Sequence, residues 1–208
     1  MIAALYVSER GPYLSVPDVD AWTVLRDARR YAGPHPVVAH PPCERWGRYW
    51  HGGPSARVRR SRGDDHGCFA AALEAVRTYG GVLEHPADSS AWAAFGLLAP
   101  PRAGGWIVAD WHGGWTCCVD QGHYGHRAQK ATWLYAVRTA LPMLTWGKSL
   151  RRVRFEDGFH SREERRRKIR TGTCQRLSKR ERSETPVPFR DLLLGLARTV
   201  NRDEVQYD

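Results

Sequence analysis

The sequence predicts an α/β protein with a mostly parallel β-sheet, helices on both faces of the sheet and a short basic insertion. Three observations support this fold class. Apolar runs of strand length alternate with amphipathic stretches of helix length along the chain. The chain has 208 residues, which is the size of one domain. Hydrophobic residues make up 42% of the chain and charged residues 26%, a balance that allows a buried core.

In chain order, the first half is predicted to hold a strand, a helix, a strand and a helix. The apolar run 2–7 predicts a buried strand. Asp20 is a typical N-cap residue, and apolar residues at helical spacing after it predict a helix that ends at a Gly-Pro pair. The run 37–40 predicts a second strand because two prolines stop it. Asp64 or Asp65 is expected to cap a second helix that ends at a Gly-Gly pair.

The second half continues with three strands and two helices. The run 82–84 predicts a strand that a His-Pro pair ends, and the serines at 89–90 predict the cap of a short helix. The runs 115–119 and 132–137 predict two further strands, separated by a turn rich in Gly and His. Pro188 is well suited to begin a final amphipathic helix, since proline is favoured in the first helical turn.

The charge of the chain is concentrated in one stretch. Lys and Arg total 32 against 22 Asp and Glu, which gives +10 with neutral His. The stretch 148–182 holds 14 basic and five acidic residues and thus carries +9 of this charge. Such a stretch on a near-neutral body is typical of a polyanion-binding surface, and from charge alone a solvated loop is an equal alternative. We therefore predict a core at 1–147, a basic nucleic-acid-binding segment at 148–182 and a C-terminal helix at 183–208 that packs back on the core.

The sequence argues against membrane and secreted classes. The longest apolar run in the C-terminal half, 192–197, is far shorter than the roughly 20 residues of a membrane span. No signal-peptide pattern is found at the start. The five cysteines are odd in number and lack the spacing of a disulfide framework. We expect a reduced, cytoplasmic monomer without membrane contact.

A zinc site is the alternative use of the cysteines and histidines near the Gly/His turn. Cys117, Cys118, His123 and His126 are the residues to weigh. Adjacent cysteines are a poor chelating pair, and the sequence contains no Cys-x-x-Cys. We therefore expect no metal, and expect the two histidines to line the crevice or satisfy the turn.

Two predicted strand ends carry residues that suit a ligand-binding edge. The strand at 37–40 leads through Pro41 and Pro42 to Cys43, which the prolines present rigidly where α/β proteins bind ligands. A single cysteine is more often a small buried hydrophobe, but the polar sequence after Cys43 favours exposure. The strand at 82–84 ends in Glu84, an acid that is awkward in a core. Both residues are predicted to face a ligand.

These residues resemble the DNA cytosine-5 methyltransferases, whose hallmark is a strand ending in Pro-Pro-Cys and, about forty residues later, a strand ending in Glu-Asn-Val. This chain has Pro-Pro-Cys at 41–43 and Glu-His-Pro at 84–86. The stretch 124–130 before an apolar run is similar to the family's Tyr-Gly turn and Gln-x-Arg-x-Arg motif. The stretch 176–181 resembles its Arg-x-Leu-Thr-x-Arg-Glu motif, and Val-Pro at 187–188 with the following helix resembles its last motif. The four matches occur in the family's order.

The resemblance implies a Rossmann-like, methyltransferase-type fold and a role for each matched residue. Carbon 5 of cytosine is a poor nucleophile, but a thiolate that adds to carbon 6 turns the ring into an enamine that attacks an electrophile. The resemblance assigns the thiolate to Cys43, hydrogen bonds to ring nitrogen 3 and the exocyclic amine to Glu84, and a nearby cation to Lys130 or Arg127. The implied partner is double-stranded DNA, whose target base leaves the stack.

The resemblance also implies S-adenosylmethionine as the methyl donor, seated by a glycine-rich loop after the first strand. The chain departs from the family here, because this loop has only Gly11. The family's second strand, whose terminal acid holds the cofactor ribose, has no obvious counterpart, and Asp18 or Asp20 is the expected substitute. Gly11, Asp20 and Pro41 are thus the expected cofactor-binding residues.

Nucleic-acid contacts are expected from two stretches. In the loop after Cys43, Arg45 is expected to contact the nucleic acid, and Trp46 and Trp50 to stack on a base. In the basic segment the expected phosphate-binding residues are Arg165, Arg166, Arg167, Lys168, Lys179 and Arg180.

Three hypotheses follow for the function. The first is a DNA cytosine-5 methyltransferase that uses S-adenosylmethionine. The second keeps the same chemistry at the base but uses a different donor. The third is a methyltransferase-fold protein that binds nucleic acid without catalysis. The missing glycine loop separates the first hypothesis from the other two.

Overall fold

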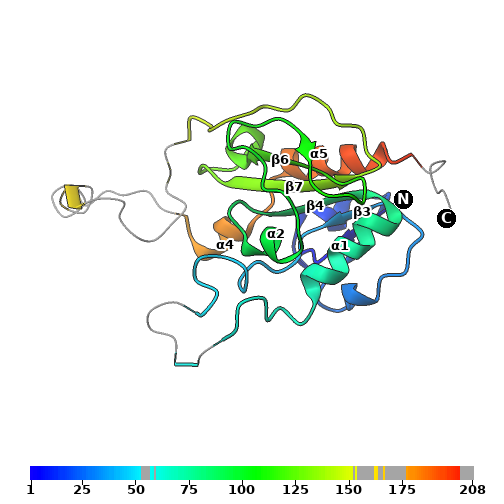
Figure 1. Cartoon of the computed structure of the whole chain (residues 1–208), viewed down its shortest axis with the longest axis horizontal. Helices are drawn as coiled ribbons and strands as arrows, with labels where there is room; N and C mark the ends of the chain where they lie inside the picture. Colours follow the sequence, from blue (N-terminus) through cyan, green and yellow to red (C-terminus); the bar gives the residue numbers. More distant parts are fainter. Residues whose placement is uncertain are drawn as a thin grey trace.

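Seven strands in the described part of the chain form one sheet in the order β2-β1-β3-β4-β7-β6-β5 (Figure 1). The computed structural model describes residues 1–52, 57–58, 60–151, 153, 162–163, 166 and 177–201. The strands are β1 (Ile2–Leu5), β2 (Val19–Trp22), β3 (Val37–Ala39), β4 (Gly81–Pro86), β5 (Ile107–Val108), β6 (Trp115–Asp120) and β7 (Ala131–Val137). Helices pack on this sheet, so the predicted α/β class is confirmed.

The sheet is parallel in one half and antiparallel in the other. β1 pairs parallel with β2 and with β3, and β3 pairs parallel with β4. β7 runs antiparallel to β4 and β6, and β5 runs antiparallel to β6. The prediction of a mostly parallel sheet is therefore wrong for the second half. The turn between β6 and β7 is too short for the crossover that parallel neighbours require.

The segment after Asp18 is a strand, where the sequence predicted a helix starting at Asp20. β2 pairs with β1 over its whole length, from Val19 beside Ile2 to Trp22 beside Leu5. Val19 and Trp22 pack against opposite core clusters, which is the alternation of a strand. A short 3₁₀ helix, η2 (Ala28–Arg30), follows it. Pairing with β1 outweighs the weak helical propensity of this segment.

One long helix covers each face of the sheet (Figure 1). α1 (Cys68–Tyr79) packs on one face through Phe69, Leu73 and Val76. α5 (Val187–Arg198) packs on the other face, where its Phe189 and Leu193 are fully buried. Each such side chain contributes about 1.5–3 kcal/mol by leaving water. The predicted helices on both faces are confirmed.

Short helices hold the loops at one end of the sheet. Ser89 caps α2 (Ser90–Ala94) by accepting a hydrogen bond from the Ala91 backbone, as the sequence predicted. The 3₁₀ helices η1 (Pro12–Ser15) and η3 (Gln121–Tyr124) follow β1 and β6. The sequence did not predict α4 (Lys179–Ser183), which starts at a capping box between Ser178 and Glu181. No helix in the described ranges is both long and apolar enough to cross a bilayer.

Candidate active site

The strand order reverses between β1 and β3. β2 lies on one side of β1, whereas β3, the next strand in the chain, lies on the other side. Such a reversal in an α/β sheet leaves a crevice outside the carboxyl ends of the strands, where ligands bind. Cys43 follows β3, and Glu84 lies in the last half of the neighbouring β4. The fold therefore brings the two predicted reactive residues to the same edge.

Cys43 is an exposed residue in a tight turn after the two prolines. Its carbonyl accepts hydrogen bonds from the backbone N–H groups of Trp46 at 3.1 Å and Gly47 at 3.2 Å. Desolvation by the surrounding protein raises the pKa of the Cys43 thiol most, and the negative charge of Glu84 raises it further. The cation of Lys130 acts in the opposite direction. In the free protein the thiol is thus protonated at neutral pH.

Glu84 is a buried carboxylate, only 8% exposed, whose two oxygens each accept a hydrogen bond. Oε2 accepts from His40 Nδ1 at 2.9 Å, and Oε1 accepts from Gln121 Nε2 at 3.1 Å. Gln121 is itself held by Thr132, whose Oγ1 lies 2.9 Å from Gln121 Nε2. Burial alone would raise the pKa of Glu84, but the hydrogen bond and charge of His40, aided by Lys130, lower it to about 2. Glu84 is therefore ionised at neutral pH.

His40 and Tyr13 belong to this site, and the sequence analysis assigned no role to either. Ala39 of β3 lies beside Leu83 of β4, so the residues that follow, His40 and Glu84, lie level with each other. Neighbouring residues at one level point to the same face, which explains the ion pair. The Tyr13 hydroxyl from η1 lies 2.8 Å from His40 Nε2. The position of His40 at a strand end was the only signal in the sequence.

His85, the neighbour of Glu84, points to the opposite face. Its ring lies edge-on to Phe69 and stacks on Trp92 at 6.3 Å between centroids. Desolvation lowers the pKa of His85 to about 4, although Glu84 and the Pro42 carbonyl act in the opposite direction. His85 is therefore neutral at neutral pH and forms part of the core beneath the Cys43 turn.

The two cations predicted beside the adduct lie in different places. Lys130 acts electrostatically on both Cys43 and Glu84, and its backbone N–H is fixed by Asp120 Oδ1 at 2.9 Å. Arg127 is exposed and forms an ion pair with Glu181 of α4. Lys130 directly precedes β7, whose start pairs with the end of β4, so its position and its charge support it as the cation of the site. Arg127 instead links the turn to α4 through Glu181.

The residues expected to hold S-adenosylmethionine do not form a cradle for it. Both oxygens of Asp20 already accept hydrogen bonds, Oδ2 from Trp22 Nε1 at 2.8 Å and Oδ1 from Arg26 at 2.6 Å. Gly11 begins η1, and a Cβ there would approach the Ser8 carbonyl at 3.1 Å. Pro41 is buried. β2 is the strand for which the sequence showed no counterpart. Its acid, Asp20, is already hydrogen-bonded to Trp22 and Arg26.

The nucleic-acid contacts predicted in the loop after Cys43 divide between core and surface. Trp46 is only 7% exposed and donates to Asp65 Oδ2 at 2.8 Å, so its ring belongs to the core and is closed to a base. Arg45 donates to the Trp50 carbonyl at 3.1 Å. The guanidinium of Arg62 lies over the Trp50 ring at 5.3 Å. The surface of this loop is thus formed by arginines and by aromatic rings stacked with them.

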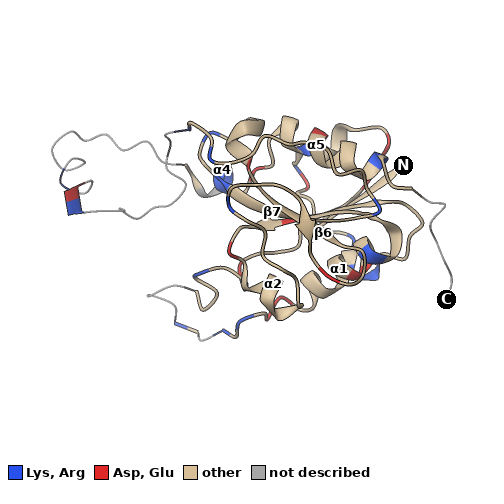
Figure 2. Ribbon diagram, turned by 45° about the horizontal axis from the view of Figure 1, so that its top comes forward, with Lys and Arg blue, Asp and Glu red and all other residues tan. Residues whose placement is uncertain are grey.

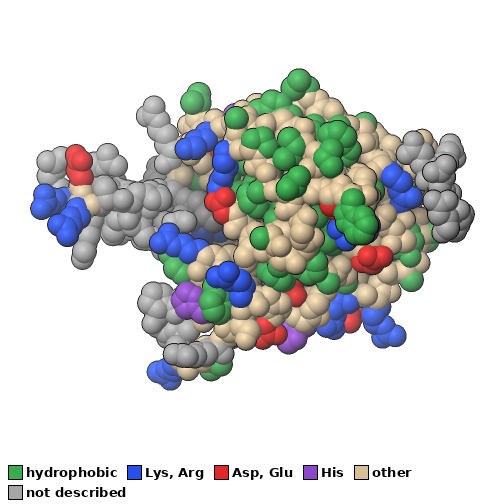
Figure 3. Space-filling model, in the orientation of Figure 1, with side chains coloured by type: hydrophobic (Ala, Val, Ile, Leu, Met, Phe, Trp, Pro, Cys, Tyr) green, Lys and Arg blue, Asp and Glu red, His purple; other side chains and the backbone are tan. Residues whose placement is uncertain are grey.

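The basic segment lies largely outside the described residues, as do Arg165, Arg167 and Lys168 among the predicted contacts. Arg166 is exposed. In α4, Arg180 is exposed and pairs with Glu184 at 3.3 Å, whereas only the backbone of Lys179 is described. Figures 1 and 2 show α4 and the loop after Cys43 at the same end of the molecule, opposite the chain termini, and Figure 3 shows Lys and Arg side chains on the surface there.

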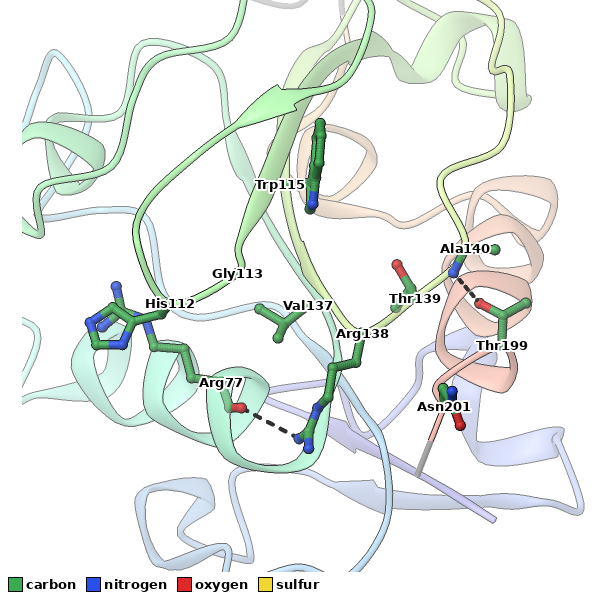
Figure 4. A pocket seen from close by; sticks show the side chains of 10 residues that line it. All are labelled: Arg77, His112, Gly113, Trp115, Val137, Arg138, Thr139, Ala140, Thr199 and Asn201. Atoms are coloured by element: carbon green, nitrogen blue, oxygen red, sulfur yellow. Dashed lines mark hydrogen bonds between the residues drawn. The ribbon is translucent and has the colours of Figure 1, made fainter. Parts of the chain in front are cut away.

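A cavity of about 680 Å³ lies at the other edge of the sheet, where β7 ends beside the start of β4 (Figure 4). Both arginines that line this cavity, Arg77 and Arg138, are hydrogen-bonded within the chain. Arg77 donates to Asp110 at 2.7 Å, and Arg138 donates to the Thr78 carbonyl at the end of α1 at 2.5 Å. This cavity is distant from the edge that carries Cys43. Within the described ranges no group of three or more His, Cys, Asp or Glu is arranged to hold a metal ion.

Comparisons with known proteins name no relative. No protein-family model, no curated protein and no solved structure matches the chain.

Proposed function

We propose that this protein is a DNA-modifying enzyme that acts at carbon 5 of cytosine through a thiolate adduct of Cys43 at carbon 6. The observation that carries the proposal is the convergence of Cys43, Glu84 and Lys130 at one edge of the sheet, where the acid and the cation both shift the pKa of the thiol. A nucleophile, a buried acid and a cation in mutual electrostatic reach are the groups that this reaction needs. The resemblance to cytosine-5 methyltransferases assigns the same roles to the same residues.

In the proposed reaction the chain's residues act on the ring in one concerted step. Cys43 Sγ bonds to carbon 6, the ring double bond moves to between carbons 4 and 5, and an electron pair reaches nitrogen 3. Before attack the Cys43 thiol releases its proton to water, and Lys130 stabilises the thiolate. Nitrogen 3 then takes a proton that is delivered through Glu84. The product is an enamine that is nucleophilic at carbon 5. A methyl donor would supply the electrophile for that carbon.

The proposed partner is double-stranded DNA. A carboxylate that is 8% exposed is reached by the edge of a ring and not by a stacked base pair, so the cytosine has to leave the duplex. The exposed arginines of the loop after Cys43 and of α4 lie at the same end as the site and suit the phosphates that flank a flipped base.

The proposal also includes S-adenosylmethionine as the methyl donor and a methyltransferase-type Rossmann fold. The reversal of strand order between β1 and β3 supports such a fold. The carboxylate of Asp20, whose two oxygens already accept hydrogen bonds within the chain, does not support the donor. Calorimetric titration with S-adenosylmethionine and S-adenosylhomocysteine decides between this donor and a different one, since binding of both at micromolar concentration is expected only for the first.

The reaction at the base is tested without any donor. A thiolate adduct makes the hydrogen on carbon 5 exchangeable, so duplex DNA that carries [5-³H]cytosine should release tritium into water. Cys43→Ser should abolish this release while leaving folding and DNA affinity intact. Cys68→Ser is the matched control, because Cys68 is a half-buried thiol at the start of α1. Release that persists in Cys43→Ser would exclude Cys43 as the nucleophile.

A nucleic-acid-binding protein without catalysis is the second candidate. The raised pKa of the Cys43 thiol and the engaged Asp20 favour it, because an active thiolate and a donor site are then unnecessary. This candidate predicts duplex binding with no tritium release from any sequence.

A further inference from the structure

We propose that Tyr13, His40 and Glu84 form a proton relay, in which His40 supplies the proton that Glu84 delivers to a ring nitrogen of the ligand. The relay deepens the proposed function and rests on it, since nitrogen 3 of cytosine is then the acceptor. Its hydrogen bonds are 2.8 Å from Tyr13 to His40 and 2.9 Å from His40 to Glu84. The three residues come from η1, the end of β3 and β4, so only the folded chain assembles them.

Glu84 needs such a source of protons. With a pKa of about 2, its carboxylate holds no proton at neutral pH. The reaction at the base nevertheless requires a proton at nitrogen 3 when the thiolate attacks. His40 Nδ1 carries the proton nearest to the carboxylate, because an ionised carboxylate only accepts hydrogen bonds and Nδ1 has to donate.

His40 is held by partners that suit both of its charge states. Burial and the charge of Glu84 raise the pKa of Tyr13 well above its ordinary value, so the hydroxyl keeps its proton. That hydroxyl accepts from Nε2–H of the charged imidazole, and it still accepts from Nε2–H of the neutral ring that remains when Nδ1 gives up its proton. The ring therefore keeps its Tyr13 partner in both charge states. His85 differs, because desolvation holds it neutral.

The transfer balances within the site. One proton moves from His40 Nδ1 to Glu84 Oε2, and one moves from the carboxyl group to nitrogen 3 as the carbon–sulfur bond forms. The step starts from the His40 imidazolium and from a Cys43 thiolate whose proton has already passed to water. His40 ends neutral, Glu84 ends as a carboxylate, and no co-reactant is consumed. Reversal of the adduct returns the proton along the same path.

Other charged groups also face the relay and enter its pH dependence. Lys130 and His85 act on Glu84, and Glu84 in turn acts on Cys43. Arg190 and Asp191 of α5 act on Tyr13. None of them lies between His40 and Glu84, whose atoms are in direct contact.

The test measures tritium release from [5-³H]cytosine DNA between pH 5.5 and 9 for the wild type and variants. His40→Asn keeps an N–H that can donate to Glu84 but cannot give up a proton. In the wild type, the rate of tritium release should decline at alkaline pH, where a proton donor is lost. In His40→Asn we expect release to fall about 100-fold and this alkaline decline, the alkaline limb of the profile, to disappear. Tyr13→Phe should lower release by a smaller factor and shift that limb. His123→Gln, a histidine of the neighbouring η3 turn bonded to the Gly147 carbonyl, is the matched control and should match the wild type.

A second measurement separates the relay from the reaction. NMR of the free protein should show that Glu84→Gln shifts the signal of the His40 Nδ1–H proton, because the carboxylate that accepts it is lost. An unchanged Nδ1–H signal, or full release with the wild-type pH profile in His40→Asn, would overturn the relay. Absence of release in the wild type, combined with a His40 Nδ1–H signal that depends on Glu84, would instead overturn the cytosine chemistry and retain the hydrogen-bonded pair.

Discussion

The negative charge of Glu84 raises the pKa of the Cys43 thiol, while the hydrogen bond from His40 keeps that same carboxylate ionised. Under the proposed function, the acid keeps the Cys43 thiol protonated until a ligand arrives. A ring N–H that donates a hydrogen bond to Glu84 would offset this charge. The thiolate would then be favoured only beside bound substrate.

This relationship predicts opposite effects of Glu84→Gln on two measurements. Alkylation of Cys43 by iodoacetamide at pH 7.5 should become about threefold faster or more, because the pKa of the thiol falls. Tritium release from cytosine DNA should fall by about two to four orders of magnitude, the usual range for a positioned acid–base group. Lys130→Met should slow alkylation, because Lys130 lowers the pKa of the thiol. A purely structural Glu84 would instead show a lower melting temperature and equal losses in both measurements.

Acid should destabilise the fold in two pH windows. Unfolding restores the pKa of His85 from about 4 to 6.5 and that of Glu84 from about 2 to 4.5. In both cases the unfolded chain binds the proton first, so stability is full above the unfolded value and is lost as the pH falls towards the folded value. The His85 window, pH 6.5 to 4, should cost on the order of 3 kcal/mol.

The variant His85→Phe isolates this contribution. Phenylalanine keeps the ring contacts with Phe69 and Trp92 and cannot take up a proton. Urea unfolding at pH 7 and pH 4.5 should therefore show a smaller loss of stability for His85→Phe than for the wild type. An equal loss would show that His85 does not set the upper window.

Two arginine clusters are predicted to contribute differently to DNA binding. Neutralising Arg165, Arg166 and Arg167 together should weaken binding to all duplex sequences about equally, because phosphate contacts carry no sequence information. Each lost contact should flatten the slope of log affinity against log salt by about 0.9. Fluorescence anisotropy over a range of salt concentrations measures both quantities.

The matched comparison is the triple substitution of Arg48, Arg60 and Arg62, which are exposed in the loop after Cys43. If this substitution alone changes affinity and salt slope, the DNA-binding surface lies beside Cys43 and not in the basic segment.

Gly81 is predicted to be irreplaceable at the start of β4. Its φ is +124°, and a Cβ there would lie 2.0 Å from the Val37 carbonyl oxygen in β3. Gly81→Ala should therefore reduce the free energy of unfolding by about 3 kcal/mol or more, or prevent folding. Gly96→Ala is the control, because Gly96 also has a positive φ but open space around it. It should cost only about 1 kcal/mol by thermal or urea unfolding.

Local sequence patterns determined most of the secondary structure. The strands at 37–40, 82–84, 115–119 and 132–137 and the helix after Asp65 were predicted close to their observed bounds. These segments combine apolar runs with strong stop signals from Gly and Pro, so neighbouring residues alone specify them. The sequence also indicated Cys43 and Glu84, because both follow such runs.

Tertiary structure alone decided which strands pair, and therefore what surrounds Cys43 and Glu84. The segment Val19–Trp22 is a strand because β1 offers it an edge, and β7 is antiparallel to β6 because the turn between them is short. Pairing of β3 with β4 places His40 level with Glu84, 44 residues away, and η1 adds Tyr13. Hydrogen bonds of this kind join residues that are distant in the chain, and no local pattern encodes them. The sequence thus indicated most of the elements and the two candidate residues, Cys43 and Glu84, whereas the fold decided the ionisation of Glu84 and the burial of Trp46.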